Sequence, residues 1–427
     1  MPADQSTPTP SFSDLVRVFA RIGVLSFGGP AGQIALMQHE LVDQRRWVDQ
    51  GAFLRALNLC HLLPGPEAQQ LATWIGWRLH GTRGGLAAGL LFVAPGALVM
   101  LGLSLLYAVA AGVGWFAALF LGIKAAVLAI VAQALIRIGK RALGTRFKLG
   151  LALAALVLLS VAGAPFPLVV LGAAVIGALV GTRRPEWLGA HAHAADLVIQ
   201  PPKRRLAAQT ALTVLVWLAI WAAPMVLVAA TLGTHHVLWD IGTFFSRLAV
   251  VTFGGAYAVL AYMAQAAVEH YHWLAPGEMA DGLGLAETTP GPLIMVTQFT
   301  GFLAAWRAPA PFEPWLAALL GAGLTTWVTF APCFLWIFAC APWMERLERA
   351  ERLQMALAAI TAAVVGVVAN LALWFALHVL FGGALSSFDW RAGVIAVLAA
   401  LMLFRWNRGV IEVLGVSALA GLVLAQV

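Results

Sequence analysis

Charged residues are scarce in this sequence. Asp, Glu, Lys and Arg make up 11% of its 427 residues, whereas hydrophobic residues make up 61%. Soluble domains average about 25% charged and about 45–50% apolar residues. A soluble core could not bury so large an apolar share, so the composition excludes an ordinary soluble protein. It predicts an all-α polytopic membrane protein, because helices satisfy their own backbone hydrogen bonds inside a lipid bilayer.

Cysteines and catalytic motifs are scarce as well. Cys60, Cys333 and Cys340 form neither a disulfide framework nor a CxxC metal pattern. The segment from His39 to Asp43 begins like the zinc motif HExxH, but Asp43 stands where the second histidine is needed. The sequence contains no P-loop and no GxSxG motif. We therefore expect no metal, no cofactor and no enzymatic activity. No basic region precedes an early apolar core, so we expect no cleavable signal peptide.

Basic residues gather in short blocks between apolar stretches, and the net charge is +7. This spacing is typical of cytoplasmic loops of a membrane protein and argues against a nucleic-acid surface. The blocks are residues 137–148, 183–205, 346–352 and 405–408. We expect all four blocks and the N-terminus to face the cytoplasm.

Several apolar stretches approach the roughly 17–25 residues that a transmembrane helix needs. Five are continuous: residues 86–111, 115–136, 209–232, 315–341 and 355–379. Residues 149–181 and 393–426 each contain a break, which predicts two helical hairpins. Residues 12–80 and 243–306 are less apolar and rich in Gly and Pro.

The sequence repeats itself at a fixed offset, which indicates an internal duplication. A shift of 226 aligns Phe27-Gly28-Gly29 with Phe253-Gly254-Gly255, and Pro64-Gly65-Pro66 with Pro290-Gly291-Pro292. After an insertion the offset becomes 237 and aligns Ala94-Pro95 with Ala331-Pro332. Shared Phe-Gly-Gly and Pro-Gly-Pro motifs in one register are not expected by chance in two apolar segments.

Loop charges predict that the two copies have opposite orientations. Residues 137–148 carry five basic residues, whereas their counterpart 381–389 carries none and has one Asp. By the positive-inside rule the copies are then inverted repeats, as in many secondary transporters. The predicted domains are residues 1–182 (first repeat), 183–207 (cytoplasmic basic linker), 208–232 (connecting transmembrane helix) and 233–427 (second, inverted repeat).

Both repeated motifs interrupt a helix. Pro lacks an N–H and clashes with the preceding turn, so Pro-Gly-Pro cannot continue a helix, whereas Pro66 and Pro292 suit the first position of a new one. Broken or re-entrant helices then point electropositive N-termini into a cavity, which predicts an anion site near the membrane midplane. The alternative is that the motifs only kink packed helices. The predicted binding residues from the motifs are Gly28, Gly29, Pro64, Gly65, Pro66, Gly254, Gly255, Pro290, Gly291 and Pro292.

Polar residues in apolar surroundings add candidates to this site. Lys124 lies inside an apolar stretch, and Arg21 and Arg247 share a repeat position shortly before Phe-Gly-Gly. These cations suit an oxyanion, although snorkelling toward the membrane surface is the alternative. Glu67 directly follows Pro66 and is a proton-coupling candidate, unless it only stabilises the helix N-terminus. Gln69 and Thr289 flank the motifs and could donate hydrogen bonds.

A set of motifs resembles the chromate ion transporter family in its long, two-domain form. These are Phe27-Gly28-Gly29-Pro30, Trp47, Pro64-Gly65-Pro66-Glu67-Ala68-Gln69-Gln70, Gly76, Gly81 and Ala94-Pro95-Gly96. The resemblance covers essentially the whole chain. It implies a multi-pass secondary transporter of the bacterial inner membrane that expels chromate and confers chromate resistance. It also implies coupling to protons or to exchange with another anion. In the second repeat Ala256 replaces Pro30 and Cys333 replaces Gly96, so the two half-sites need not contribute equally.

Other functions stay open at this point. A carrier for sulfate or another oxyanion is a close alternative, because sulfate and chromate are near-isosteric. A passive anion channel and an intramembrane enzyme using His61 and Glu67 are further alternatives. Chromate as substrate and the lipid bilayer are the expected partners, nucleic acid is not, and a homodimer is left open.

Overall fold

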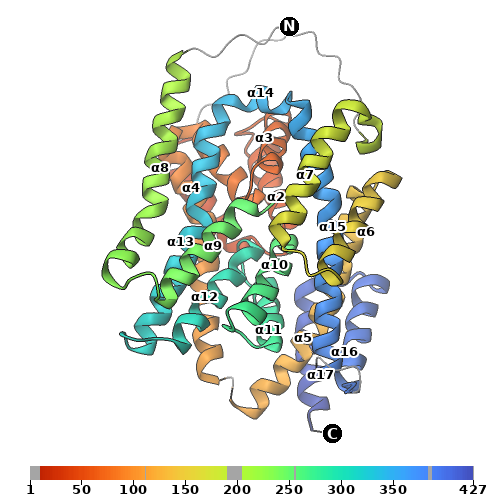
Figure 1. Ribbon diagram of the computed structural model, residues 1–427. Helices are drawn as coiled ribbons and strands as arrows, with labels where there is room; N and C mark the ends of the chain where they lie inside the picture. Colours follow the sequence, from red (N-terminus) through yellow and green to blue (C-terminus); the bar gives the residue numbers. More distant parts are fainter. Residues whose placement is uncertain (1–9, 111, 190–203, 254–255, 383–386, 427) are drawn as a thin grey trace.

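The computed structural model describes residues 10–110, 112–189, 204–253, 256–382 and 387–426 (Figure 1). Every regular element in these ranges is a helix. Six of them are long and apolar enough to cross a membrane, which confirms a polytopic all-α protein. The predicted residues Gly254 and Gly255 and most of the predicted linker lie outside the described residues.

The described residues of the first half, 10–110 and 112–189, form seven α-helices. They are α1 (Phe12–Leu25), α2 (Gly29–Gln38), α3 (Gln50–Leu62), α4 (Glu67–Ala110), α5 (Gly114–Ala142), α6 (Arg146–Ser160) and α7 (Phe166–Arg183). Helix α4 is broken at His80 and Gly81, whose backbone angles are not helical. It therefore consists of a short segment directly after Pro-Gly-Pro and a long segment that follows the break.

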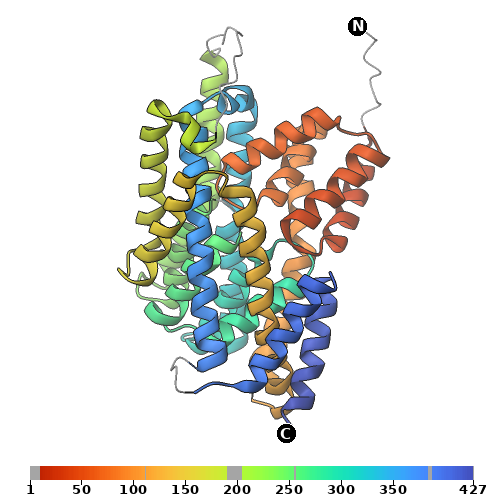
Figure 2. The same cartoon turned by 90° about the vertical axis from the view of Figure 1, so that its right-hand side faces the viewer.

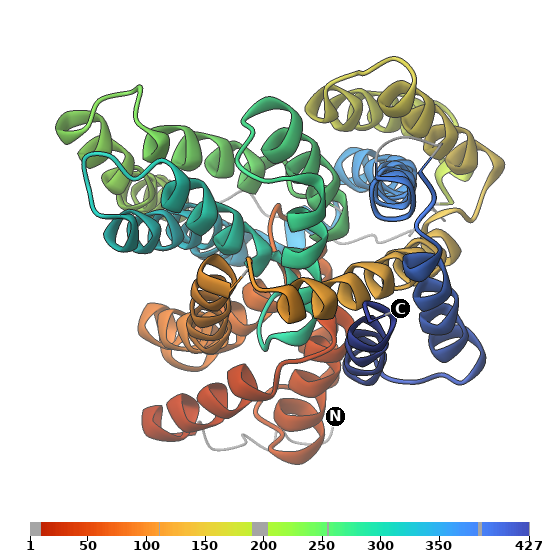
Figure 3. The ribbon, with the colours of Figure 1, turned by 90° about the horizontal axis from the view of Figure 1, so that it is seen from below.

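The second half follows α8 (Arg204–Thr231), which lies at the edge of the molecule in Figure 1. Its helices are α9 (Val237–Val251), α10 (Ala256–Gln265), α11 (Pro276–Thr288), α12 (Val296–Arg307), α13 (Pro314–Cys340), α14 (Met344–Glu348), α15 (Glu351–Phe381), α16 (Trp390–Ala400) and α17 (Val410–Leu424). Figure 3 shows the two predicted hairpins, α6–α7 and α16–α17, at the rim of the molecule.

Backbone conformation repeats at the same offset as the sequence. Arg46 and His272, 226 residues apart, both have positive φ, at 54° and 55°. A π-helical turn precedes each of them, η1 (His39–Gln44) and η3 (Ala266–His270). Trp47 N–H donates to Leu41 O at 2.8 Å, and Trp273 N–H donates to Ala267 O at the same distance. The two halves therefore share local structure as well as motifs.

Corresponding elements lie toward opposite ends of the molecule. In Figure 1, α2 and α3 lie in the upper part, and their counterparts α10 and α11 lie in the lower part. Figure 2 shows the same relation for the α6–α7 hairpin and the α16–α17 hairpin.

One detail of the predicted helix starts is wrong. Pro66 and Pro292 were expected at the first helical position, but α4 begins at Glu67 and the 3₁₀ turn η4 (Leu293–Met295) begins after Pro292. Pro292 has φ −64° and ψ 137°, which is extended, so it caps the turn. The fixed φ of proline suits an extended cap as well as a first helical residue.

Candidate functional site

Four segments between helices carry or adjoin the repeated motifs, and we call them the four tips. They are residues 26–28 between α1 and α2, residues 64–66 between α3 and α4, residues 252–255 between α9 and α10, and residues 290–292 between α11 and α12. Of the third tip, Thr252 and Phe253 are described.

The tips of one half bond to the tips of the other. Gly65 N–H donates to Thr252 O at 2.9 Å, and Gly291 N–H donates to Ser26 O at 2.8 Å. Gly65 and Gly291 are repeat counterparts, and so are Ser26 and Thr252. The two bonds therefore join equivalent positions of the two repeats. Both glycines have positive φ, 121° and 88°, which other residues rarely adopt.

The long helices α4 and α13 contact the tips that contain Gly291 and Gly65, respectively. A Cβ atom on Gly96 of α4 would overlap the carbonyl oxygen of Pro290 and lie 3.3 Å from Gly291 Cα. At the counterpart position of α13, the Cys333 thiol lies against Gly65, where an added Cβ would be 2.9 Å from Sγ. The replacement of glycine by cysteine in the second repeat thus fills space beside the first-repeat tip.

Buried amide side chains surround the tips. Gln33 Nε2 donates to Gly291 O at 2.6 Å, and Gln70 Nε2 donates to Pro64 O at 2.7 Å. Gln69 and Gln298 donate to the Thr73 hydroxyl and to Ala97 O, respectively. Among the described residues the side-chain oxygens of all four glutamines have no hydrogen-bond partner. A buried acceptor without a partner costs about 1–3 kcal/mol, so these oxygens can accept from a ligand or from water.

The predicted donors lie in this region as well. Gln69 is fully buried and Thr289 is 2% exposed. Thr289 donates its hydroxyl to Ala286 O. Each hydrogen bond of the four buried glutamines engages one of the two amide N–H groups of its side chain. Further donors for an anion are first-turn backbone N–H groups directly after Pro66 and Pro292, which have no partner within their own helix. Gln33 contributes to this site but was missed, although it is a single amide four residues after Gly29.

Glu67 lies beside the second tip. Its Oε1 is 3.5 Å from His61 Nδ1, and its side chain is 12% exposed, compared with 51% for His61. The carboxylate is thus nearly buried in the first helical turn, with an ionisable partner that faces outward. This geometry is compatible with its predicted role as a proton carrier.

The predicted arginines are placed differently. Arg21 lies five residues before Ser26, but its guanidinium is 3.7 Å from the buried Glu40 and its side chain is 60% exposed. Arg45 also pairs with Glu40, at 3.2 Å. Arg247 lies at the same repeat position on α9 and is exposed. The structure therefore directs Arg21 toward Glu40 and not toward a tip.

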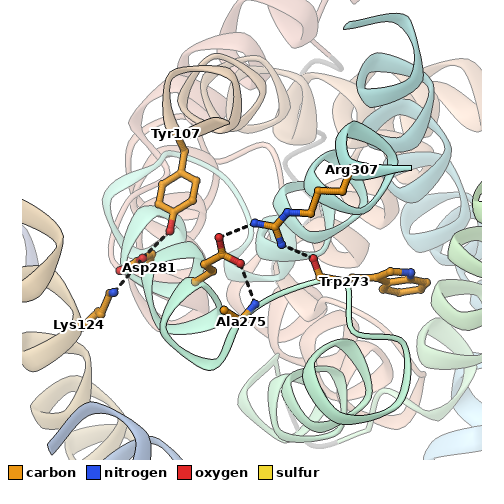
Figure 4. Close-up of polar contacts among 7 residues, drawn as sticks. Tyr107, Lys124, Trp273, Ala275, Asp281 and Arg307 are labelled. Carbon is orange, nitrogen blue, oxygen red and sulfur yellow. Dashed lines mark hydrogen bonds and ion pairs between the residues drawn. The ribbon is translucent and has the colours of Figure 1, made fainter. Parts of the chain in front are cut away.

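Lys124 belongs to a separate polar network (Figure 4). Its Nζ is 3.4 Å from Asp281 Oδ2, and the Tyr107 hydroxyl donates to the same oxygen at 2.6 Å. One turn earlier on α11, Glu278 pairs with Arg307 at 2.5 Å. The sequence prediction missed Asp281, although an aspartate within a Gly- and Leu-rich segment was a signal that could have identified it.

A second buried carboxylate, Glu287, was also missed. It lies three residues before Pro290 and accepts a hydrogen bond from the Tyr257 hydroxyl at 2.5 Å. Its repeat counterpart is His61, the partner of Glu67. Each Pro-Gly-Pro tip therefore has an acidic residue nearby, but at different repeat positions: Glu67 directly follows the second tip, and Glu287 precedes the fourth.

Comparison with known proteins gives a consistent result. The family model described as chromate transporter matches residues 13–178 and 239–422. The chromate transport protein of Pseudomonas aeruginosa is 31% identical over 371 residues, which is 85% of this chain and 81% of that protein. The chromate transport protein of Cupriavidus metallidurans is 27% identical over 375 residues, covering 85% and 82%. A probable chromate transport protein of Synechococcus elongatus is 26% identical over 363 residues, covering 85% and 84%. No solved structure matches the chain.

Proposed function

The chain belongs to the chromate transporter family, and from this premise we propose that it exports chromate across the bacterial inner membrane by alternating access. Chromate is a tetrahedral dianion, which needs several convergent hydrogen-bond donors. The observation that carries the proposal is the hydrogen bonding of the four tips in two equivalent pairs. Helix N-termini there offer backbone N–H groups and a partial charge of about +0.5 each.

The symmetry of the tips supports alternating access. The bonds from Gly65 to Thr252 and from Gly291 to Ser26 are equivalent, so opening one pair and closing the other would expose the site to opposite faces in turn. Secondary transporters of inverted-repeat construction bind substrate near the midplane between their repeats. We accordingly propose that residues 1–182 and 233–427 are inverted repeats, joined by the basic linker 183–207 and the helix 208–232, with the N-terminus in the cytoplasm.

The proposed binding residues are those of the tips together with Gln69 and Thr289. Lys124, Arg21 and Arg247 are proposed to attract the oxyanion along its path. Coupling is to the proton gradient or to exchange with an external anion, and Glu67 is the candidate proton carrier of the first repeat. Its pairing with the half-exposed His61 supports this role, because His61 provides contact with solvent.

The test is uptake of radiolabelled chromate into everted membrane vesicles, with a protonophore or with sulfate added. An exporter accumulates chromate in such vesicles, and either addition lowers the accumulation, depending on the coupling mode. Glu67→Gln should abolish the effect of the protonophore if Glu67 carries the proton. Uptake that ignores both additions would contradict the proposed coupling and would favour a passive channel.

Sulfate is the second candidate substrate. Backbone N–H donors at helix N-termini recognise the charge and shape of an anion and do not distinguish its central atom. Competition therefore separates the two candidates. Unlabelled sulfate that displaces chromate at equal concentration would favour a general dianion carrier, whereas displacement by chromate alone would support a dedicated chromate exporter.

A further inference from the structure

The carboxylate at the centre of the Lys124 network has partners for only one of its two oxygens among the described residues. Asp281 of α11 is buried, with 2% of its side chain exposed, and contacts Lys124 of α5 and Tyr107 of α4. Lys124 and Tyr107 both contact Oδ2, whereas the buried Oδ1 has no hydrogen-bond partner among the described residues. Figure 4 shows the lysine and the tyrosine approaching the same end of the aspartate. The ionised carboxylate thus depends on Lys124 for its only direct cationic contact in the described structure.

The two partners differ in access. Lys124 retains 28% exposure of its side chain, compared with 2% for Asp281. The lysine is therefore the more accessible partner of the pair, and the carboxylate is closed off from a dissolved oxyanion. An oxyanion that binds Lys124 competes directly with Asp281 for the same charge. Loss of the lysine contact would leave a buried carboxylate without a cation, which is strongly unfavourable unless the carboxylate takes up a proton.

We propose that Asp281 binds one proton when the transported oxyanion takes Lys124, and releases it when the Lys124–Asp281 ion pair forms again. This inference rests on the proposed transport of an oxyanion. No covalent bond to the substrate forms in this step. The proton moves from water to the Asp281 carboxylate. The ammonium group of Lys124 keeps its charge and changes its partner from the carboxylate to the anion.

The surroundings of Asp281 fit this exchange. On α11, Glu278 adds negative charge one turn away and is itself paired with Arg307 of α12. Tyr107 of α4 is neutral and donates to the carboxylate. Helices α15 and α17 also pack on α11, and their charged residues lie in their terminal turns. Lys124 is thus the cation in direct contact with Asp281.

The Lys124–Asp281 pair has no equivalent at the corresponding positions of the repeat. The repeat counterparts of Asp281 and Lys124 are Arg55 and Thr361, so the first half cannot form the same pair. Asp281 precedes Pro290 by nine residues, or about 14 Å of helix at 1.5 Å per residue. The ion pair therefore joins α5 to the part of α11 that precedes the fourth tip, and α11 lies toward the lower end of the molecule in Figure 1. An anion that travels between the tips and that end would meet Lys124.

The test measures chromate binding to the purified full-length protein as a function of pH. In the wild type, the affinity should fall by up to about tenfold per pH unit once Asp281 is ionised, because one proton is linked to binding. Asp281→Asn should lose this protein-dependent component and bind more tightly than the wild type at high pH. Glu278→Gln, one turn away on the same helix, is the matched control: it should keep the one-proton slope, with the fall in affinity beginning at lower pH because a negative charge near Asp281 is lost. Chromate's own protonation is common to all variants and cancels in the comparison.

Two further measurements keep the proposal testable if Asp281→Asn does not fold. Adding chromate to a weakly buffered wild-type solution should produce proton uptake by the protein, and Lys124→Ala should not show it. Tyr107→Phe removes a donor to the ionised carboxylate, so tight binding should persist to higher pH.

The outcomes separate the two claims. A wild-type pH profile and wild-type proton uptake in Asp281→Asn would overturn this inference alone and leave chromate transport standing. A flattened profile in Glu278→Gln would also overturn it, since the proton would then belong to Glu278. A wild-type protein that binds no oxyanion at any pH would overturn the proposed function, and this inference with it.

Discussion

The contact between α4 and the fourth tip allows a prediction in which two physical effects have opposite signs. Gly96 lies inside α4 and faces the carbonyl of Pro290 and the Cα of Gly291. On helix propensity alone, Gly96→Ala should stabilise the protein by about 1 kcal/mol. The contact predicts the reverse, because the new methyl group would overlap a backbone carbonyl that has no rotamer by which to move away.

The magnitude follows from the same geometry. Overpacking a well-packed interior costs about 1–3 kcal/mol. Gly102, six residues further along α4, has open space around it, so Gly102→Ala is a control that retains only the propensity gain. The propensity gain is common to both variants, so they should differ by the overpacking cost, about 1–3 kcal/mol, with Gly96→Ala the less stable.

The assay is thermal unfolding in detergent combined with chromate uptake in everted vesicles. Gly96→Ala should unfold at lower temperature than the wild type and transport poorly, because displacement of Pro290 disturbs the Gly291–Ser26 bond. Gly102→Ala should unfold at the wild-type temperature or above and transport normally. Equal stability and equal transport in the two variants would refute the inferred contact between α4 and the tip.

Three other predictions concern the tips, the arginines and the topology. Gln33→Leu removes the hydrogen bond to Gly291 O, so it should lower the free energy of unfolding by about 1 kcal/mol and reduce transport. Gln38→Leu at the surface should change neither, and equal behaviour of the two variants would contradict the role of Gln33. Arg247→Ala should lower chromate tolerance of cells without loss of protein from the membrane, and normal tolerance would remove Arg247 from the transport path. In a background without native cysteines, an impermeant maleimide should label Ser387→Cys in intact cells but Gly144→Cys only after permeabilisation; labelling of both from one side would contradict inverted repeats.

The positions of the tips could be predicted because Pro and Gly act on the backbone locally. Pro64 to Pro66 cannot lie inside a helix, whatever surrounds them, so a break was certain to be found there. The repeat offset then predicted the second break at Pro290. Membrane spans were predictable for a similar reason, since the length of an apolar stretch is a local property.

The partners of these elements could not be predicted, because they depend on contacts between distant residues. Nothing local to Ser26 indicates that its carbonyl accepts from Gly291. Lys124 was recognised as unusual, but its partner Asp281 lies 157 residues away on a helix of ordinary appearance. The charge of Arg21 is evident from the sequence, but its contact with the buried Glu40 depends on how η1 folds against α1.

The most direct test of an oxyanion site at the four tips is anomalous diffraction at the chromium absorption edge from crystals of the protein grown with chromate. We predict one chromium position within hydrogen-bonding reach of the first-turn backbone N–H groups after Pro66 and Pro292. Chromium bound only at the surface loops, with the tips closed to any ligand, would contradict the account.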